Sequence, residues 1–116
     1  MWQIEFYETE DGKTPVQMFL DSLDIKMRAK ALKEIMILHE LGTAVREPYS
    51  KPIEDGLLEL RIKFASNITR IFYFFFVGDK IVLTSGFIKK AQKTPKNEIE
   101  KAMRYKIDYE RRYSHD

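Results

Sequence analysis

Residues 56–102, GLLELRIKFASNITRIFYFFFVGDKIVLTSGFIKKAQKTPKNEIEKA, decide the fold of this chain. Runs with the composition of β-strands lie at residues 57–65, 69–77 and 80–87. The dipeptides Ser66-Asn67 and Gly78-Asp79 separate these runs, and both are typical of tight turns between antiparallel strands. Beyond Arg70 the middle run is apolar on both faces, which predicts a central strand that is covered from both sides.

The segment before this stretch predicts one strand and two helices. Residues 2–8 alternate between apolar and polar side chains, as a half-buried strand does. The expected helices cover residues 15–22 and 25–41. Thr14-Pro15 is a start signal for the first helix, and Asp24 is a suitable cap for the second. Gly42 stands where a left-handed residue commonly ends a helix.

The remaining segments complete the predicted fold. Residues 43–55 contain Pro48 and Pro52 and predict an irregular connector. Thr94-Pro95 repeats the helix-start signal and opens a final helix that runs to about residue 112. The order β-α-α-β-β-β-α predicts an α+β fold with a four-stranded, mainly antiparallel sheet, two N-terminal helices and a C-terminal helix. The chain has 116 residues, so we expect one domain over residues 1–116.

The spacing of apolar and charged residues predicts which faces of the two longer helices are buried. On the helix at 25–41, the expected inward residues are Ile25, Leu32, Ile35, Met36 and Leu38. On the final helix, charges of alternating sign recur at every fourth residue. They predict a solvent-facing ladder of ion pairs, made of Glu100, Arg104, Asp108 and Arg112.

Charge is distributed unevenly along the chain. Residues 1–56 contain seven Lys or Arg and eleven Asp or Glu, for a net charge of −4. Residues 57–116 contain thirteen and seven, for a net charge of +6. This asymmetry predicts that one face of the molecule meets a polyanion, and chance scatter in a small protein is the alternative interpretation.

The composition excludes several kinds of protein. There is no cysteine, so disulfides and thiolate metal sites are excluded. No apolar run approaches the roughly 18 residues of a membrane-spanning helix. The acidic N-terminus lacks the pattern of a signal peptide, and we therefore expect a cytoplasmic protein. Neither His39 nor His115 has acidic or histidine neighbours at metal-ligand spacing, so no metal site is predicted.

The strand at 57–65 carries the first candidates for chemistry. Its alternation places Glu59, Arg61 and Lys63 on one face, opposite a row of apolar residues. Arg61 suits bidentate binding of a phosphate, and Glu59 would orient Arg61 or accept a proton. The alternative interpretation is an exposed ion pair that contributes little.

Further candidates follow along the chain. Arg70 opens the middle strand, whereas Tyr73 falls on the opposite face of a regular strand and is an ordinary core aromatic in the alternative interpretation. Lys89, Lys90 and Lys93 lead to the N-terminus of the final helix, where cations oppose the helix dipole. A bound anion would explain their position, and a solvated basic loop is the alternative.

Taken together, these motifs resemble a known family. The motifs are Lys51, GLLELR at 56–61, RIFY at 70–73, GFIKKAQKTP at 86–95, and Glu98-Ile99 with Ala102. They are similar to those of the phage Gp49-like, or HigB-type, toxins of the RelE/ParE superfamily. The resemblance implies a RelE-like fold and ribosome-dependent cleavage of translated mRNA. It also implies a helix-turn-helix antitoxin of the HigA type, through which operator DNA is bound.

The resemblance implies an active site as well. The positions that match the family's motifs are Lys51, Glu59, Arg61, Arg70, Tyr73, Lys89 and Lys90. We expect catalytic roles for Glu59, Arg61, Arg70, Tyr73 and Lys89, and RNA contacts from Lys51, Lys63, Lys90 and Lys93. No cofactor or metal is expected. The 2′-hydroxyl of the RNA would attack the adjacent phosphorus, with cations stabilising the developing charge and Glu59 or Tyr73 accepting the proton.

Two other functions are compatible with the sequence. ParE-type members of the superfamily share the fold and inhibit DNA gyrase by binding it, but they lack the cationic site. A non-catalytic, phage-derived RNA-binding protein would bind RNA with a strong dependence on salt and leave the RNA intact.

Overall fold

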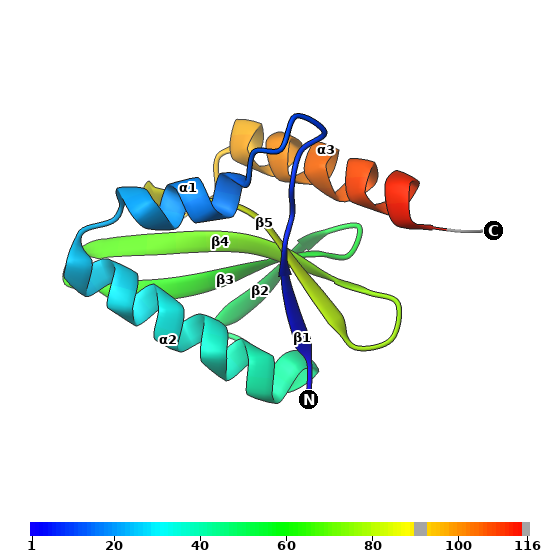
Figure 1. Cartoon of the computed structure of the whole chain (residues 1–116). Helices are drawn as coiled ribbons and strands as arrows, with labels where there is room; N and C mark the ends of the chain where they lie inside the picture. Colours follow the sequence, from blue (N-terminus) through cyan, green and yellow to red (C-terminus); the bar gives the residue numbers. More distant parts are fainter. Residues whose placement is uncertain (90–92, 115–116) are drawn as a thin grey trace.

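A five-stranded mixed sheet forms the middle of the molecule (Figure 1). The computed structural model describes residues 1–89 and 93–114. The strands are β1 (Gln3–Phe6), β2 (Ser50–Glu54), β3 (Leu57–Phe64), β4 (Asn67–Phe76) and β5 (Lys80–Lys89). The helices are α1 (Pro15–Ser22), α2 (Ile25–Leu41) and α3 (Lys96–Tyr113), with a 3₁₀ turn η1 (Gly42–Ala44) after α2. The strand order is β1-β5-β4-β3-β2, and only the β1–β5 pair is parallel within the described residues.

The α+β class is confirmed, but the predicted number of strands is wrong. The segment expected to be an irregular connector contains β2, which pairs antiparallel with β3 and places Lys51 opposite Glu59. Pro52 has no N–H to donate, and this is tolerated because β2 is the edge strand of the sheet. Pro52, which indicated a connector, therefore lies in an edge strand, and the sheet has five strands, not four.

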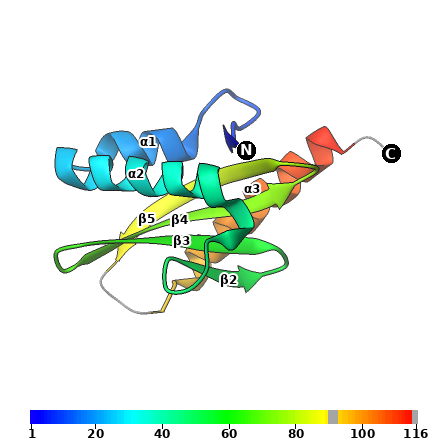
Figure 2. The same ribbon diagram turned by 90° about the horizontal axis from the view of Figure 1, so that it is seen from below.

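Helices cover both faces of the sheet (Figure 2). The helices α1 and α2 pack on one face, where Leu20 and Leu38 meet Leu60 and Tyr73 in the larger hydrophobic cluster. The helix α3 packs on the other face, which carries two smaller clusters. Because both faces are covered, β4 is buried along most of its length, as its doubly apolar sequence predicts.

The predicted helix boundaries of α2 are confirmed in atomic detail. The Asp24 side chain accepts a hydrogen bond of 2.8 Å from the backbone N–H of Met27. Gly42 ends the helix with a φ of +50°. A Cβ atom at Gly42 would lie 2.0 Å from the Trp2 ring, so this position needs glycine both for its backbone conformation and for the close approach of the indole.

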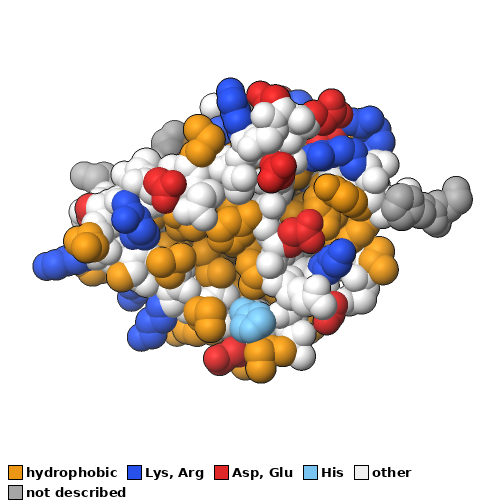
Figure 3. Space-filling view, in the orientation of Figure 1, with side chains coloured by type: hydrophobic (Ala, Val, Ile, Leu, Met, Phe, Trp, Pro, Cys, Tyr) orange, Lys and Arg blue, Asp and Glu red, His pale blue; other side chains and the backbone are white. Residues whose placement is uncertain are grey.

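The predicted buried face of α2 is partly wrong. Ile35 and Leu38 are buried as expected, but Ile25, Leu32 and Met36 are 79%, 46% and 55% exposed. Met27 and Ala31 are buried instead, because they lie at helical spacing on the same stripe as Ile35 and Leu38. Hydrophobic side chains accordingly gather over α1 and α2 on the surface seen in Figure 3.

Half of the expected ladder of ion pairs on α3 holds the N-terminal segment in place. Asp108 and Arg112 form an ion pair of 2.9 Å, and the hydroxyl of the buried Tyr7 donates a hydrogen bond of 2.6 Å to Asp108. The Arg112 guanidinium lies 5.5 Å from the centre of the Tyr7 ring. This half of the ladder is therefore packed against the segment after β1, whereas Glu100 and Arg104 are exposed as predicted.

None of the helices in the described part of the chain is long and apolar enough to cross a membrane.

Candidate nucleic-acid interface

The pairing of β3 with β4 brings the first three candidate residues together. Arg61 lies directly opposite Arg70, and Glu59 lies opposite Phe72, two residues along the same ladder of pairs. Alternation along both strands places Glu59, Arg61 and Arg70 on the face of the sheet that α3 covers. The sequence grouped Glu59 with Arg61, and the strand register adds Arg70 to them.

The Glu59 carboxylate is the centre of a buried polar network. Its Oε1 atom accepts hydrogen bonds from Arg61 Nε at 3.0 Å and from Arg70 Nη1 at 3.4 Å. Its Oε2 atom accepts a hydrogen bond from the Thr94 hydroxyl. Arg70 Nη1 also donates to Thr94 Oγ1 at 2.9 Å, so the four side chains form one connected group.

Burial differs sharply within this network. The side chains of Glu59 and Arg70 are completely buried, whereas the Arg61 side chain is 25% exposed. The Arg70 guanidinium also lies 5.9 Å from the centre of the Phe87 ring, within cation–π range. A buried charge is tolerated when it is paired and hydrogen-bonded. Glu59 thus holds Arg70 below the surface and directs Arg61 toward solvent.

Two adjoining hollows open above this network. One, of about 310 Å³, is lined by Pro48, Lys51, Arg61, Lys63, Ile68 and Arg70. The other, of about 200 Å³, is lined by Lys51, Pro52, Ile53, Arg61, Lys93, Thr94 and Ile99. Because they share Lys51 and Arg61, we treat them as one cleft and call it the cationic cleft. Among the described residues, no Asp or Glu lines either hollow.

The cationic cleft collects most of the residues predicted from the sequence. Lys51, Lys63 and Lys93 come from β2, β3 and the segment before α3, and all three are exposed. The lysine side chains therefore surround Arg61 from three elements that are not consecutive in the chain. Lys89 is the last residue of β5, and its side chain, like the whole of Lys90, lies outside the described residues.

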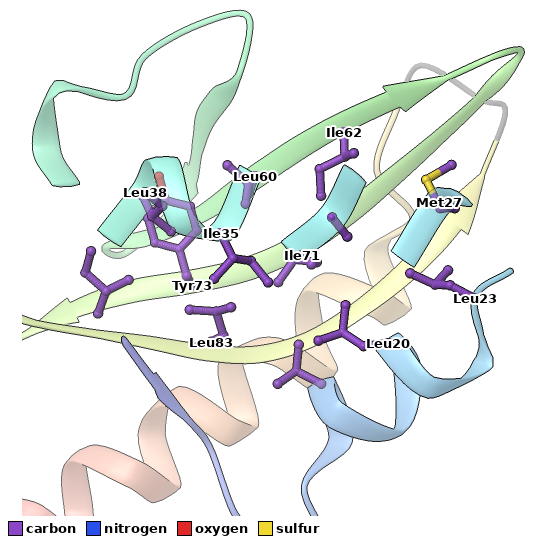
Figure 4. Close-up of a cluster of buried hydrophobic side chains, with 13 residues drawn as sticks. Leu20, Leu23, Met27, Ile35, Leu38, Leu60, Ile62, Ile71, Tyr73 and Leu83 are labelled. Atoms are coloured by element: carbon purple, nitrogen blue, oxygen red, sulfur yellow. The ribbon is translucent and has the colours of Figure 1, made fainter. Parts of the chain in front are cut away.

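Tyr73 lies away from the cationic cleft, on the other face of the sheet. Its ring points into the cluster with Leu38, Leu60 and Leu83 (Figure 4), and its hydroxyl shares a hydrogen bond with Ser50. Burial raises the pKa of the Tyr73 hydroxyl. Regular alternation along β4 puts Tyr73 on the same face as Ile71 and opposite to Arg70, because the extra residue of the bulge in the β4–β5 pairing is in β5. The structure therefore supports the alternative interpretation of a core aromatic.

Thr94 is a site residue that the sequence did not reveal. Its motif predicts a helix cap, but Pro95 is the N-cap residue, α3 begins at Lys96, and no side chain caps the helix. The Thr94 hydroxyl instead binds Glu59 and accepts from Arg70. A Thr-Pro pair suits either role, so the sequence contained no signal that separates them.

Within residues 1–89 and 93–114, no group of three or more His, Asp or Glu side chains is arranged to hold a metal ion.

Comparison with known proteins places this arrangement in a family. The family model described as "Phage derived protein Gp49-like" matches residues 18–106, which include β2 to β5 and most of α3. The chain is also 36% identical, over 98 residues, to proteins named "Probable endoribonuclease HigB1" from two strains of Mycobacterium tuberculosis, CDC 1551 / Oshkosh and ATCC 25618 / H37Rv. Each alignment covers 84% of this chain and 76% of the relative. The chain therefore belongs to the family of phage-derived Gp49-like proteins.

Proposed function

We propose that this protein is the toxin of a type II toxin–antitoxin system and that it cleaves mRNA on the translating ribosome. The observation that carries the proposal is the cationic cleft, in which Arg61 and three lysines surround one space above a buried Glu59–Arg70 pair. The name of the mycobacterial relatives, probable endoribonuclease, supports the same class of reaction.

The proposed chemistry is cleavage of the RNA backbone without a metal. The 2′-oxygen attacks the adjacent phosphorus as its proton passes to water, and the bond to the 5′-oxygen breaks as that oxygen takes a proton from water. The products are a 2′,3′-cyclic phosphate and a 5′-hydroxyl. Negative charge develops on the phosphoryl oxygens, where a guanidinium positioned beforehand stabilises it most effectively. Arg61 is the arginine for this role because its side chain reaches the cleft surface.

The other residues have supporting roles in this proposal. Arg70 is buried, so its charge acts from beneath the cleft floor without contact with the substrate. Glu59 and Thr94 orient the two arginines through hydrogen bonds. Lys51, Lys63 and Lys93 attract the flanking phosphates, as lysines do in most contacts with nucleic-acid backbones.

The ribosome and an antitoxin are the proposed partners. Within the cleft, the described residues include no histidine, and the buried Glu59 is already engaged by three donors. An enzyme of this kind benefits from a substrate that is already positioned, because positioning alone supplies much of the rate. We propose that the ribosome positions the mRNA in the cytoplasm. The antitoxin would be a HigA-type helix-turn-helix protein through which operator DNA is bound.

The test is primer extension on translated and untranslated copies of one mRNA, with wild-type protein and Arg61→Ala. We expect cuts only within the translated frame. Loss of one charge-stabilising group should lower the cleavage rate on the order of 100-fold. Arg61→Lys keeps the charge but loses the planar guanidinium, so its cleavage rate should lie between those of the wild type and Arg61→Ala.

Three outcomes would contradict the proposal. If Arg61→Ala cleaves at the wild-type rate, the site assignment is wrong. If cuts are equal in untranslated mRNA, ribosome dependence is wrong. If RNA stays intact while replication stops, the chain acts as the gyrase-binding members of the superfamily do.

A further inference from the structure

A third hollow adjoins the cationic cleft at the edge of the sheet. It has a volume of about 120 Å³ and is lined by Lys30, Glu34, Pro48, Tyr49, Arg61 and Lys63. Pro48, Arg61 and Lys63 also line the cationic cleft, so the two spaces are continuous. The third hollow differs from the cleft because it contains an exposed aromatic ring and an acidic side chain.

The backbone holds Tyr49 at this place. The N–H of Arg61 donates a hydrogen bond of 2.8 Å to the Tyr49 carbonyl, which continues the β2–β3 pairing by one residue. The N–H of Tyr49 donates to the Arg46 carbonyl at 2.9 Å and closes a turn. The Tyr49 side chain is nevertheless 59% exposed. A fixed backbone that presents an exposed ring beside a phosphate site is a suitable platform for base stacking.

Glu34 determines what kind of group the third hollow accepts. It projects from α2, is half-buried, and makes no ion pair or side-chain hydrogen bond with any residue that the structure describes. Lys30, Arg61 and Lys63 also line the third hollow, so a phosphate can approach it, but Glu34 is the one acidic side chain among the described residues that line any of these three hollows. A carboxylate accepts hydrogen bonds but donates none. It therefore selects a ligand with exposed N–H groups.

We propose that the third hollow is a base-binding subsite for the nucleotide next to the cleaved phosphate. The base stacks on the ring of Tyr49, and Glu34 accepts a hydrogen bond from the exocyclic amino group of the base. Adenine, cytosine and guanine carry such a group. Uracil lacks an amino group, and its N3–H donor lies between two carbonyl oxygens that a carboxylate repels. The subsite thus discriminates against uracil at one position relative to the cut. This inference rests on the proposed RNA cleavage.

The experiment measures cleavage of ribosome-bound mRNAs that differ in one base beside the cut. Stacking is worth a few kcal/mol per base, so Tyr49→Ala should lower cleavage roughly 5- to 100-fold. Tyr49→Phe keeps the ring and should cleave at nearly the wild-type rate, whereas Tyr49→Leu should behave as Tyr49→Ala does. Tyr113→Ala is the matched control, because Tyr113 is a 46% exposed tyrosine on α3 that lines none of the three hollows.

Two readouts separate base binding from a merely structural effect. The Tyr49→Ala defect should appear mainly in KM and should vanish with an mRNA that carries an abasic nucleotide at the selected position. Glu34→Gln can donate as well as accept, so this variant should cleave uracil-containing sites as readily as the others.

The outcomes distinguish this inference from the function on which it rests. Arg61→Ala is measured in parallel, and full activity of that variant would overturn the proposed function itself. If Arg61→Ala is inactive while Tyr49→Ala and Glu34→Gln keep the wild-type rate and base preference, only the base-binding subsite is wrong. A Tyr49→Ala defect that persists with the abasic mRNA would also overturn the subsite.

Discussion

At the residue scale, Glu59 is the group through which the two arginines of the cationic cleft are connected. Arg61 and Arg70 face each other across the β3–β4 pair, and two guanidinium groups at such close range repel one another. The carboxylate offsets this repulsion by accepting from both, and Thr94 links it to Arg70 a second time. We therefore expect Glu59 to matter for stability as well as for cleavage.

Removing the Glu59 carboxylate should destabilise the protein strongly. Glu59→Ala leaves the completely buried Arg70 charge without its carboxylate, and breaking a buried pair in this way costs about 3–5 kcal/mol. Urea denaturation measures the free energy of unfolding. Glu54→Ala is the control, because Glu54 is exposed at the end of β2. Equal stability of the Glu59→Ala and Glu54→Ala variants would show that the buried network is not stabilising.

Tyr73 should be dispensable for cleavage despite its place in the family's motif. Its hydroxyl binds Ser50 in the core, and burial raises the pKa of the hydroxyl, which makes it a poorer proton acceptor at neutral pH. Tyr73→Phe removes one buried hydrogen bond and should cost about 1 kcal/mol of stability. We expect the cleavage rate per folded molecule to stay at the wild-type level. A loss of cleavage comparable with that of Arg61→Ala would refute the position of Tyr73 in the structure.

At the scale of elements, α3 is held at both ends. Near its N-terminus, Ile99 and Ala102 pack with Leu57 and Phe72 of the sheet. Near its C-terminus, Asp108 accepts from Tyr7 at 2.6 Å and pairs with Arg111 and Arg112. The segment before α3 supplies Thr94 and Lys93 to the cationic cleft, so the anchoring of α3 also positions part of the site.

The Asp108 anchor should make stability depend on acid pH. The pKa of Asp108 lies below its usual value, chiefly because the Tyr7 hydroxyl donates to the carboxylate and further because Arg111 and Arg112 lie beside it. A carboxylate with a depressed pKa stabilises the fold above the ordinary pKa of about 3.9. That contribution is lost as the pH falls through the depressed pKa. The wild-type free energy of unfolding should therefore decrease more steeply below about pH 4 than that of Asp108→Asn.

Urea denaturation across this pH range measures the difference, and Tyr7→Phe is an informative second variant. It keeps the ring that packs against Tyr105 and Arg112 but removes the hydroxyl donor. Its pH dependence should lie between those of the wild type and Asp108→Asn. Identical curves for all three proteins would show that Asp108 is not linked to folding.

At the scale of the whole molecule, charge is segregated around the open edge of the sheet. The strand β2 is short, so the far end of β3, with Lys63, is not covered by a neighbouring strand on that side. The cationic cleft opens at this edge, and its exposed cations come from three separate elements. The modest net charge of +2 therefore conceals a local concentration of positive charge.

This arrangement predicts a salt-dependent affinity for RNA. Each phosphate contact contributes about 0.7 to the slope of log affinity against log salt for single strands. Lys51→Ala, Lys63→Ala and Lys93→Ala should each reduce the slope by about that amount. The measurement uses a non-cleavable RNA with methylated 2′-hydroxyls. Lys80→Ala is the control, because Lys80 starts β5 at the end opposite to Lys89. An equal change in slope for Lys80→Ala would show that the cleft is not the RNA-binding surface.

Local sequence patterns were sufficient for all the helices and strands except β2, and for part of the site. Alternation placed Glu59 and Arg61 on one face of β3, and the start and end signals of α2 are confirmed at Asp24 and Gly42. Patterns of this kind succeed because they depend on the geometry of one strand or helix. The family resemblance rested on the same local motifs and is confirmed by the match over residues 18–106.

The remaining features depend on the tertiary structure, because they follow from the register of strand pairing and from the packing of elements against one another. The pairing of β3 with β4 brought Arg70 to Glu59, and α3 brought Thr94 to the same carboxylate. The proline-containing segment forms β2 because it pairs with β3 at the edge of the sheet, and this pairing places Tyr49 beside Arg61. The sequence alone determines which charges each segment carries and how the segments with a clear periodicity or cap fold. The tertiary structure decides which charges meet, because residues far apart in the chain become neighbours only when the faces of several elements are buried together.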